Sequence, residues 1–78
     1  MYKMQIRLST PAIVHEFVCI CSKYECDINL YDGRNVFDAK SIVSCISIDS
    51  GKNLKVQAIS SNEDVVVNFI NDMKKFEV

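Results

Sequence analysis

The chain has 78 residues, 49% of them hydrophobic, with 2 Gly and 1 Pro, which is typical of a single globular domain over residues 1–78 rather than of a disordered or disulfide-rich chain. Its 9 basic and 10 acidic residues leave a formal net charge of -1, so composition predicts no nucleic-acid partner. No apolar run approaches the ~18 residues that span a bilayer, and Met1 leads into a strand pattern rather than a signal peptide. We therefore expect a cytoplasmic protein without a membrane partner.

The first two elements are predicted to be a strand and a helix that meet at Ser-Thr-Pro. Apolar and polar residues alternate over residues 2–8, the period of a half-buried strand, with an apolar side of Tyr2, Met4, Ile6 and Leu8. Ser9 or Thr10 can cap the helix, and Pro11 suits its first position, where a missing N–H costs nothing. The helix should end near Lys23 or Tyr24. Its apolar face is predicted to consist of Ile13, Phe17, Ile20, Cys21 and Tyr24.

Two short strands and a short helix are predicted next. Asp32-Gly33 favours a tight hairpin turn, because both residues tolerate a positive φ. Ile28 and Leu30, before this turn, are expected to face the core. Ser41 is predicted to cap the short helix, which is indicated by the apolar spacing of Ile42, Cys45 and Ile46.

The last two elements are predicted to be a strand over residues 54–60 and a closing helix. The inward side of the strand should consist of Leu54, Val56 and Ala58. Ser61 or Asn62 can cap the helix, whose apolar face is predicted to consist of Val66, Phe69, Ile70, Met73 and Phe76. The order strand, helix, strand, strand, helix, strand, helix indicates an α+β fold with helices on one face of an antiparallel sheet.

The four cysteines do not form a metal-binding pattern. Cys19 and Cys21 are about 200° apart around the predicted helix, so they cannot share a tetrahedral ion. Cys26 and Cys45 add no C-x-x-C pair, and the chain has 1 His. We therefore expect reduced thiols, most of them packed, and no metal site.

Three segments resemble the HPr family, the histidine-containing phosphocarrier proteins of the bacterial sugar phosphotransferase system. They are HEFVCICSKYECDINLY at 15–31, AKSIVSCISID at 39–49 and SGKNLKVQAISSNED at 50–64. Together the likeness extends over nearly the whole chain. It implies an HPr-like open-faced β-sandwich, βαββαβα, with a four-stranded antiparallel sheet in the order 1-4-2-3 and three helices on one face. It also implies a protein that is not an enzyme and needs no cofactor.

The sequence departs from the family at the start of the first helix. Members carry a Gly-x-His-x-Arg-Pro-Ala-type segment there, whose histidine takes phosphate from enzyme I. Aligning Phe17-Val18 with the family's Phe-Val places Thr10 at the phosphohistidine position and Ala12 at the arginine. In this respect the chain resembles the catabolite-repression paralogue, a phosphoserine-dependent regulator.

His15 is the alternative phosphate acceptor. With Pro11 as the first helical residue, His15 is the fifth, so it lies beyond the first four residues, which alone have N–H groups free to stabilise a phosphoryl group. Helical rotation turns it away from Phe17, toward an outer stripe with Cys19 and Ser22. An exposed helix histidine is the favoured interpretation, and a carrier phosphorylated on His15 by enzyme I is the alternative.

The family docks on its partners through the first helix and the short second helix. Carried over to this chain, that face consists of Ala12, His15, Ile42, Val43 and Ile46. The short helix has more aliphatic residues than one face can bury, so part of this set should be exposed; internal packing of all five is the alternative.

Ser41 matches the serine that HPr kinase phosphorylates in Gram-positive relatives, where the product recruits a catabolite-control regulator. Its position at a helix start, beside Lys40, favours a phosphate; the alternative is a helix cap alone. The resemblance thus implies a regulatory module of the phosphotransferase system without phosphohistidine transfer. Its expected partners are HPr kinase, the catabolite-control regulator and enzyme I. A structural domain with an unrelated partner is a third hypothesis.

Overall fold

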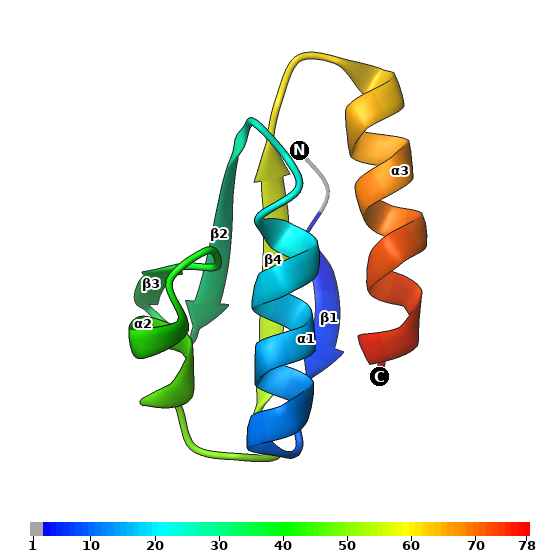
Figure 1. The fold of residues 1–78 in the computed structure, drawn as a ribbon. Helices are drawn as coiled ribbons and strands as arrows, with labels where there is room; N and C mark the ends of the chain where they lie inside the picture. The colour runs from blue at the N-terminus through cyan, green and yellow to red at the C-terminus, as the bar shows by residue number, and fades with distance from the viewer. Residues whose placement is uncertain (1–2) are drawn as a thin grey trace.

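Residues 3–78, the part of the chain that the computed structural model describes, form strands, helices and a 3₁₀ turn (Figure 1). They are β1 (Met4–Arg7), α1 (Pro11–Cys21), β2 (Asp27–Asp32), β3 (Asn35–Asp38), α2 (Ile42–Ile46), β4 (Asn53–Ile59), α3 (Glu63–Met73) and the 3₁₀ turn η1 (Lys74–Phe76). The predicted element order is confirmed, although the expected inward position of Tyr2 lies outside the described residues. No helix of residues 3–78 is long and apolar enough to cross a membrane.

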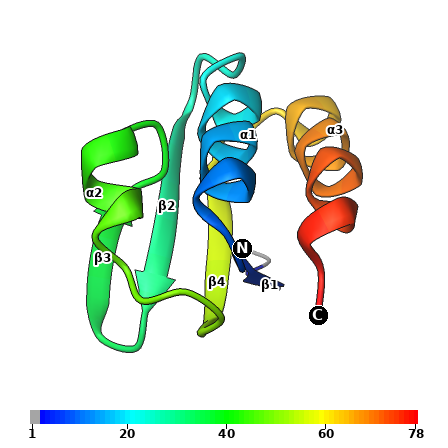
Figure 2. The same ribbon diagram turned by 60° about the horizontal axis from the view of Figure 1, so that its bottom comes forward.

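The four strands form one antiparallel sheet in the order β1-β4-β2-β3, as predicted. Cross-strand partners share a face of a sheet, so the register defines rows of side chains. One such row runs across the sheet through Met4, Val56, Leu30 and Phe37. It faces the helices, which cover one side of the sheet and leave the other open (Figures 1 and 2).

The core lies between this side of the sheet and the helices. The inward residues predicted for β1, β2 and β4 are buried there: Met4, Ile6, Leu8, Ile28, Leu30, Leu54, Val56 and Ala58. The ring of Phe17 on α1 meets that of Phe76 edge-on at a centroid distance of 5.6 Å. Tyr24 and Phe69 form a second edge-on pair at 5.4 Å, which links the end of α1 to α3.

The buried face of α1 differs in rotation from the predicted one. Phe17 and Cys21 are buried as expected, but Val14 and Val18 are buried more completely than Ile13 and Ile20. The helix contacts α2 and shares the core with the strands, and burial on both sides widens its buried stripe.

The turn between β2 and β3 corrects a second expectation. Asp32 pairs with Asn35, so the two central residues are Gly33 and Arg34. Only Gly33 has a positive φ, of 61°. A positive φ at the first central residue alone suits a two-residue hairpin with Gly in that position.

The helix ends also differ slightly from the prediction. Ser22 caps α1, about one residue before the predicted end. After Met73 the chain tightens into η1, and Glu77 then bridges to Ile6 at the edge of β1.

Candidate functional site

The first turn of α1 is occupied by its own cap. Thr10 is the N-cap, and its Oγ1 accepts a hydrogen bond from the N–H of Ile13 at 3.2 Å. Pro11 has no N–H, and the N–H of Val14 donates to the Thr10 carbonyl at 3.0 Å. Ala12 therefore supplies the remaining helical N–H of this turn. The turn offers an anion fewer free N–H groups than the sequence predicts, because the threonine side chain engages one of them.

His15 is exposed on α1, beyond this turn. Relative to Thr10 it lies about 7.5 Å further along the helix axis and about 140° around it. Ala12 and Cys19, three residues before and four after, are exposed on the same stripe. The imidazole and the capping threonine thus face different directions.

Ser41 caps α2 and is half-buried. Its Oγ accepts a hydrogen bond from the N–H of Ser44 at 3.3 Å, and its own N–H donates to the Asp38 carbonyl at 3.0 Å. The Lys40 ammonium does not contact Ser41, since it donates to the Tyr24 carbonyl at the end of α1. Asp38 also accepts a bond from the backbone N–H of Lys40, at 2.9 Å from its Oδ1. The hydroxyl therefore lies at a helix start with a carboxylate near it and the lysine turned elsewhere.

The short helix α2 buries one side chain, Cys45, and leaves others in solvent. Val43 is 76% exposed and Ile46 is 48% exposed, while Ile42 is half-buried against the core. Single exposed aliphatic side chains are common on protein surfaces, and it is their grouping on α2 that favours an interaction surface here.

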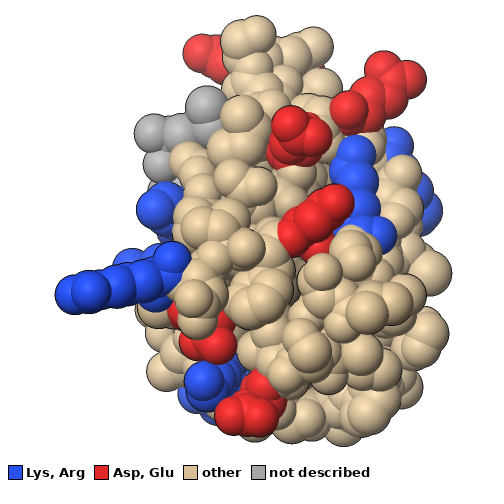
Figure 3. Space-filling model, turned by 90° about the vertical axis from the view of Figure 1, so that its left-hand side faces the viewer, with Lys and Arg blue, Asp and Glu red and all other residues tan. Residues whose placement is uncertain are grey.

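We use the name docking surface for the five residues that the resemblance predicts to contact partners: Ala12, His15, Ile42, Val43 and Ile46. The two helices that carry these residues contact each other. No Lys, Arg, Asp or Glu occurs between Ser41 and Ile48. In Figure 3, a broad part of the face at lower right accordingly has no charged side chain.

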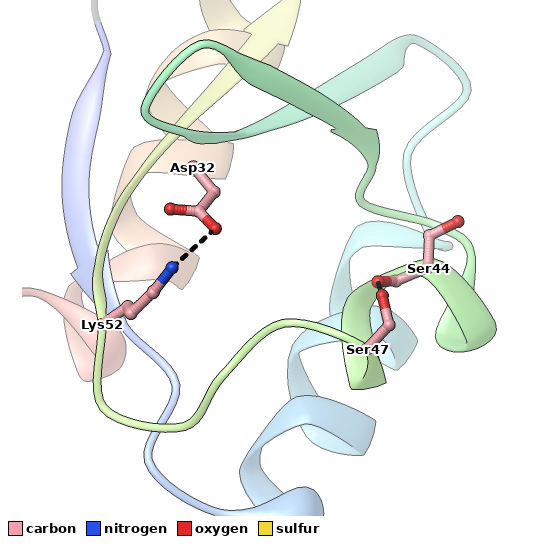
Figure 4. Close-up of polar contacts among 4 residues, drawn as sticks. All are labelled: Asp32, Ser44, Ser47 and Lys52. Carbon is pink, nitrogen blue, oxygen red and sulfur yellow. Dashed lines mark hydrogen bonds and ion pairs between the residues drawn. The ribbon is translucent and has the colours of Figure 1, made fainter.

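Polar contacts hold α2 and the loop that follows it. Ser47 Oγ donates to the Ser44 carbonyl at 2.6 Å, which closes the last turn of the helix. Further along, the Lys52 ammonium pairs with Asp32 at 3.3 Å, which ties the loop to the β2–β3 turn (Figure 4). The α2 part of the docking surface is therefore followed by a loop that is tied to the β2–β3 turn, although the exposed ion pair itself stabilises little.

Two of the four thiols lie in the core where α1 and α2 meet. Burial raises the pKa of Cys21 to about 12, with a smaller contribution from neighbouring Cys45, and burial raises the pKa of Cys45 to about 11. Cys19 is exposed and Cys26 half-buried. Among residues 3–78, no group of three or more His, Cys, Asp or Glu side chains could hold a metal ion.

We expect iodoacetamide at pH 8 to alkylate Cys19 at least about ten-fold faster than Cys21 or Cys45, because the thiolate is the nucleophile and burial suppresses it. Peptide mass spectrometry of the native protein would measure the three rates. Equal rates at Cys19 and Cys45 would contradict the burial of α2 against the core.

The same thiols predict a loss of stability in alkali. Their pKa values are raised in the folded state from an ordinary 9.0, so burial stabilises the fold fully below about pH 9. We expect the free energy of unfolding to fall as the pH rises from 9 toward the folded values of about 11 and 12. Urea denaturation of wild type and Cys45→Ala across this range would measure it. A pH dependence that is identical in the two proteins would contradict the assignment to Cys45.

No protein-family model matches the sequence, and no curated protein matches it. A solved structure that is similar to the chain is that of HPr-C-His from Thermoanaerobacter tengcongensis. Its TM-score is 0.73 at 21% sequence identity, and the likeness covers 96% of this chain and 92% of that chain. The chain has an HPr-like fold.

The likeness to this solved structure confirms the predicted architecture. At 21% identity it shows the fold alone. It assigns no role to Thr10, His15 or Ser41, which stay predictions. A group of residues that the sequence did not single out lies on the open side of the sheet, where Lys3 and Tyr31 meet. Alternation in β1 and β2 is the signal that could have found it, because it turns every second side chain away from the core.

Proposed function

We propose that the chain is a cytoplasmic, HPr-like regulatory module of the phosphoenolpyruvate-dependent sugar phosphotransferase system, which binds protein partners and transfers no phosphate through histidine. The observation that carries this proposal is the N-cap of α1. Thr10 fills the cap, and its hydroxyl is bonded to the Ile13 N–H. In the family that the sequence resembles, an imidazole is found at this position.

The chemistry of Thr10 and Ala12 supports the absence of transfer. A threonine hydroxyl would form a phosphate ester, which gives up its phosphoryl group far less readily than a phosphorylated imidazole. Ala12 replaces the family's arginine, so no guanidinium neutralises a phosphate here. His15 has no arginine next to it in the sequence and is exposed to water.

The docking surface supports a binding role. The cores of protein interfaces are depleted of charged residues, and this surface presents Val43 and Ile46 in a segment without charge. HPr kinase, a catabolite-control regulator and enzyme I are the partners that the resemblance implies.

Ser41 is the proposed switch. A phosphate on its Oγ would replace the cap bond to the Ser44 N–H with a charge-assisted one at the positive end of α2. The nearby Asp38 would repel it, and Lys40 would offset this repulsion by leaving the Tyr24 carbonyl. Phosphorylation would thereby alter the surface beside Ile42 and Val43.

We expect HPr kinase and ATP to place one phosphate on the chain, because Ser41 lies at a helix start and Lys40, the residue before it, would turn toward a phosphate there. Intact-mass and peptide mass spectrometry would locate it. Ser41→Ala should abolish the label, while the matched control Ser44→Ala should keep it. A chain that stays unmodified, or a label that survives Ser41→Ala, would leave the proposed function without its switch.

An atypical phosphocarrier is the second candidate. The observation that favours it is the exposure of His15 within the docking surface, where enzyme I could reach the ring. The two candidates differ in one outcome, since only a carrier forms an acid-labile phosphate that depends on His15.

A further inference from the structure

The side of the sheet that faces away from the helices carries a regular array of polar side chains. On β4, Lys55 lies opposite Gln5 on one side and Tyr31 on the other, and Asn53 lies opposite Arg7. Lys3 extends over this face, with its Nζ 4.2 Å from the centroid of the Tyr31 ring. No helix covers it, because the helices lie on the other side (Figures 1 and 2).

Three cations on this face have no anionic partner. Arg7 donates to the neutral Asn53 Oδ1, at 2.8 Å from Nη2, and Lys3 rests on an aromatic ring. Among residues 3–78, the salt bridges are made by Lys52 and Lys75. Lys3, Arg7 and Lys55 therefore pair with no carboxylate in this part of the chain. The array therefore carries three cations without a salt bridge, which outnumber the two carboxylates on the same face, Asp27 and Asp38.

The spacing of these cations suits an extended polyanion. Lys3 and Arg7 are four residues apart along one strand, about 13 Å, with Lys55 beside the midpoint between them. Three charges spread over this length cannot converge on one small anion. Two carboxylates share the face. Asp38 lies on β3, three strands from β1 and therefore about 14 Å from it, and Asp27 lies on β2, four residues and about 13 Å along the strand from Tyr31.

Tyr31 distinguishes between kinds of polyanion. Its hydroxyl donates to Gln57 Oε1 at 2.8 Å and accepts from Asn29 Nδ2 at 3.3 Å, which fixes the ring on the sheet surface. If Lys3 turned to a phosphate, the face of the ring would be free for a base. Aromatic rings on open sheets stack with unpaired bases, and neighbouring amides can bond to base edges, whereas an acidic peptide gains nothing from stacking.

We propose that this open face binds single-stranded nucleic acid, with Lys3, Arg7 and Lys55 on phosphates and Tyr31 under a base. The proposal does not rest on the proposed function, which uses the opposite side of the molecule. The net charge of -1 predicts no attraction for the molecule as a whole. The structure adds that the charge is unevenly distributed, and association depends on the local field.

The test is the anisotropy of a fluorescein-labelled 12-nucleotide oligouridine titrated with the whole chain. For three phosphate contacts, log K should fall with log salt at a slope of about -2, and by about 30-fold from 20 to 100 mM. The double variant Lys3→Gln/Lys55→Gln should bind at least about ten-fold more weakly, with a slope near -0.7. Lys23→Gln/Lys74→Gln, which removes the same charge from exposed positions off this face, should bind like wild type.

Tyr31 provides the second arm. Tyr31→Phe should retain binding, and Tyr31→Leu should lose at least about five-fold because stacking is lost; circular dichroism would check that both variants fold. No anisotropy change at 20 mM salt, or an equal loss in both lysine pairs, would overturn the proposal. So would undiminished binding by Tyr31→Leu together with displacement by polyglutamate, since that result would assign the face to an acidic polypeptide.

Discussion

Val43→Asp is expected to weaken binding of HPr kinase or enzyme I at least about ten-fold, which corresponds to about 1.4 kcal/mol. The side chain is 76% exposed at the centre of an uncharged segment, so a partner that covers it would bury the new carboxylate without a counter-charge. The free energy of unfolding should change by no more than about 0.5 kcal/mol, since the position makes little contact with the core.

Isothermal titration calorimetry with each partner would measure the affinity, and urea denaturation the stability. Val67→Asp is the matched control, because Val67 is 55% exposed on α3, outside the docking surface. It should bind like wild type. An unchanged affinity for Val43→Asp, or an equal loss in the control, would remove α2 from the proposed interface.

Phe17→Ala should cost about 3–5 kcal/mol of unfolding free energy. The ring is fully buried and lies edge-on against Phe76, so its loss opens a cavity between α1 and η1. A domain of this size has a total stability of about 4–12 kcal/mol, so the variant should lose a large part of it. Because the same helix carries Ala12 and His15, docking should fail together with the fold.

Urea denaturation followed by circular dichroism would measure this loss. Val67→Ala serves as the control, since an exposed aliphatic position should change stability by about 0.5 kcal/mol or less. A Phe17→Ala loss below about 1 kcal/mol would show that α1 is held by contacts other than those described.

Most of the fold could be predicted from the sequence, because alternation and caps are local signals. The alternating residues of β4, and those of β1 that the structure describes, were placed correctly, as was the cap Ser41, and Thr10 is one of the two caps predicted for α1. The rotation of α1 could not be predicted in this way, since Ile13, Val14, Phe17 and Val18 are all apolar. The contact with α2 decides which of them turn inward.

The candidate site was less predictable than the fold. Ile42, Val43, Cys45 and Ile46 look alike in a hydrophobic pattern, and the exposure of Val43 emerges only once α2 has packed. The direction of the Lys40 ammonium, toward the Tyr24 carbonyl, depends on residues 16 positions apart. Contacts of that range have no signature in a single sequence.

The most direct measurement of the central claim is incubation of the chain with enzyme I and radiolabelled phosphoenolpyruvate, beside an HPr that carries the active-site histidine. We expect acid-labile label on that HPr and none on this chain, in wild type and in His15→Ala alike. Acid-labile label on wild type that disappears in His15→Ala would establish a phosphocarrier and contradict the regulatory function.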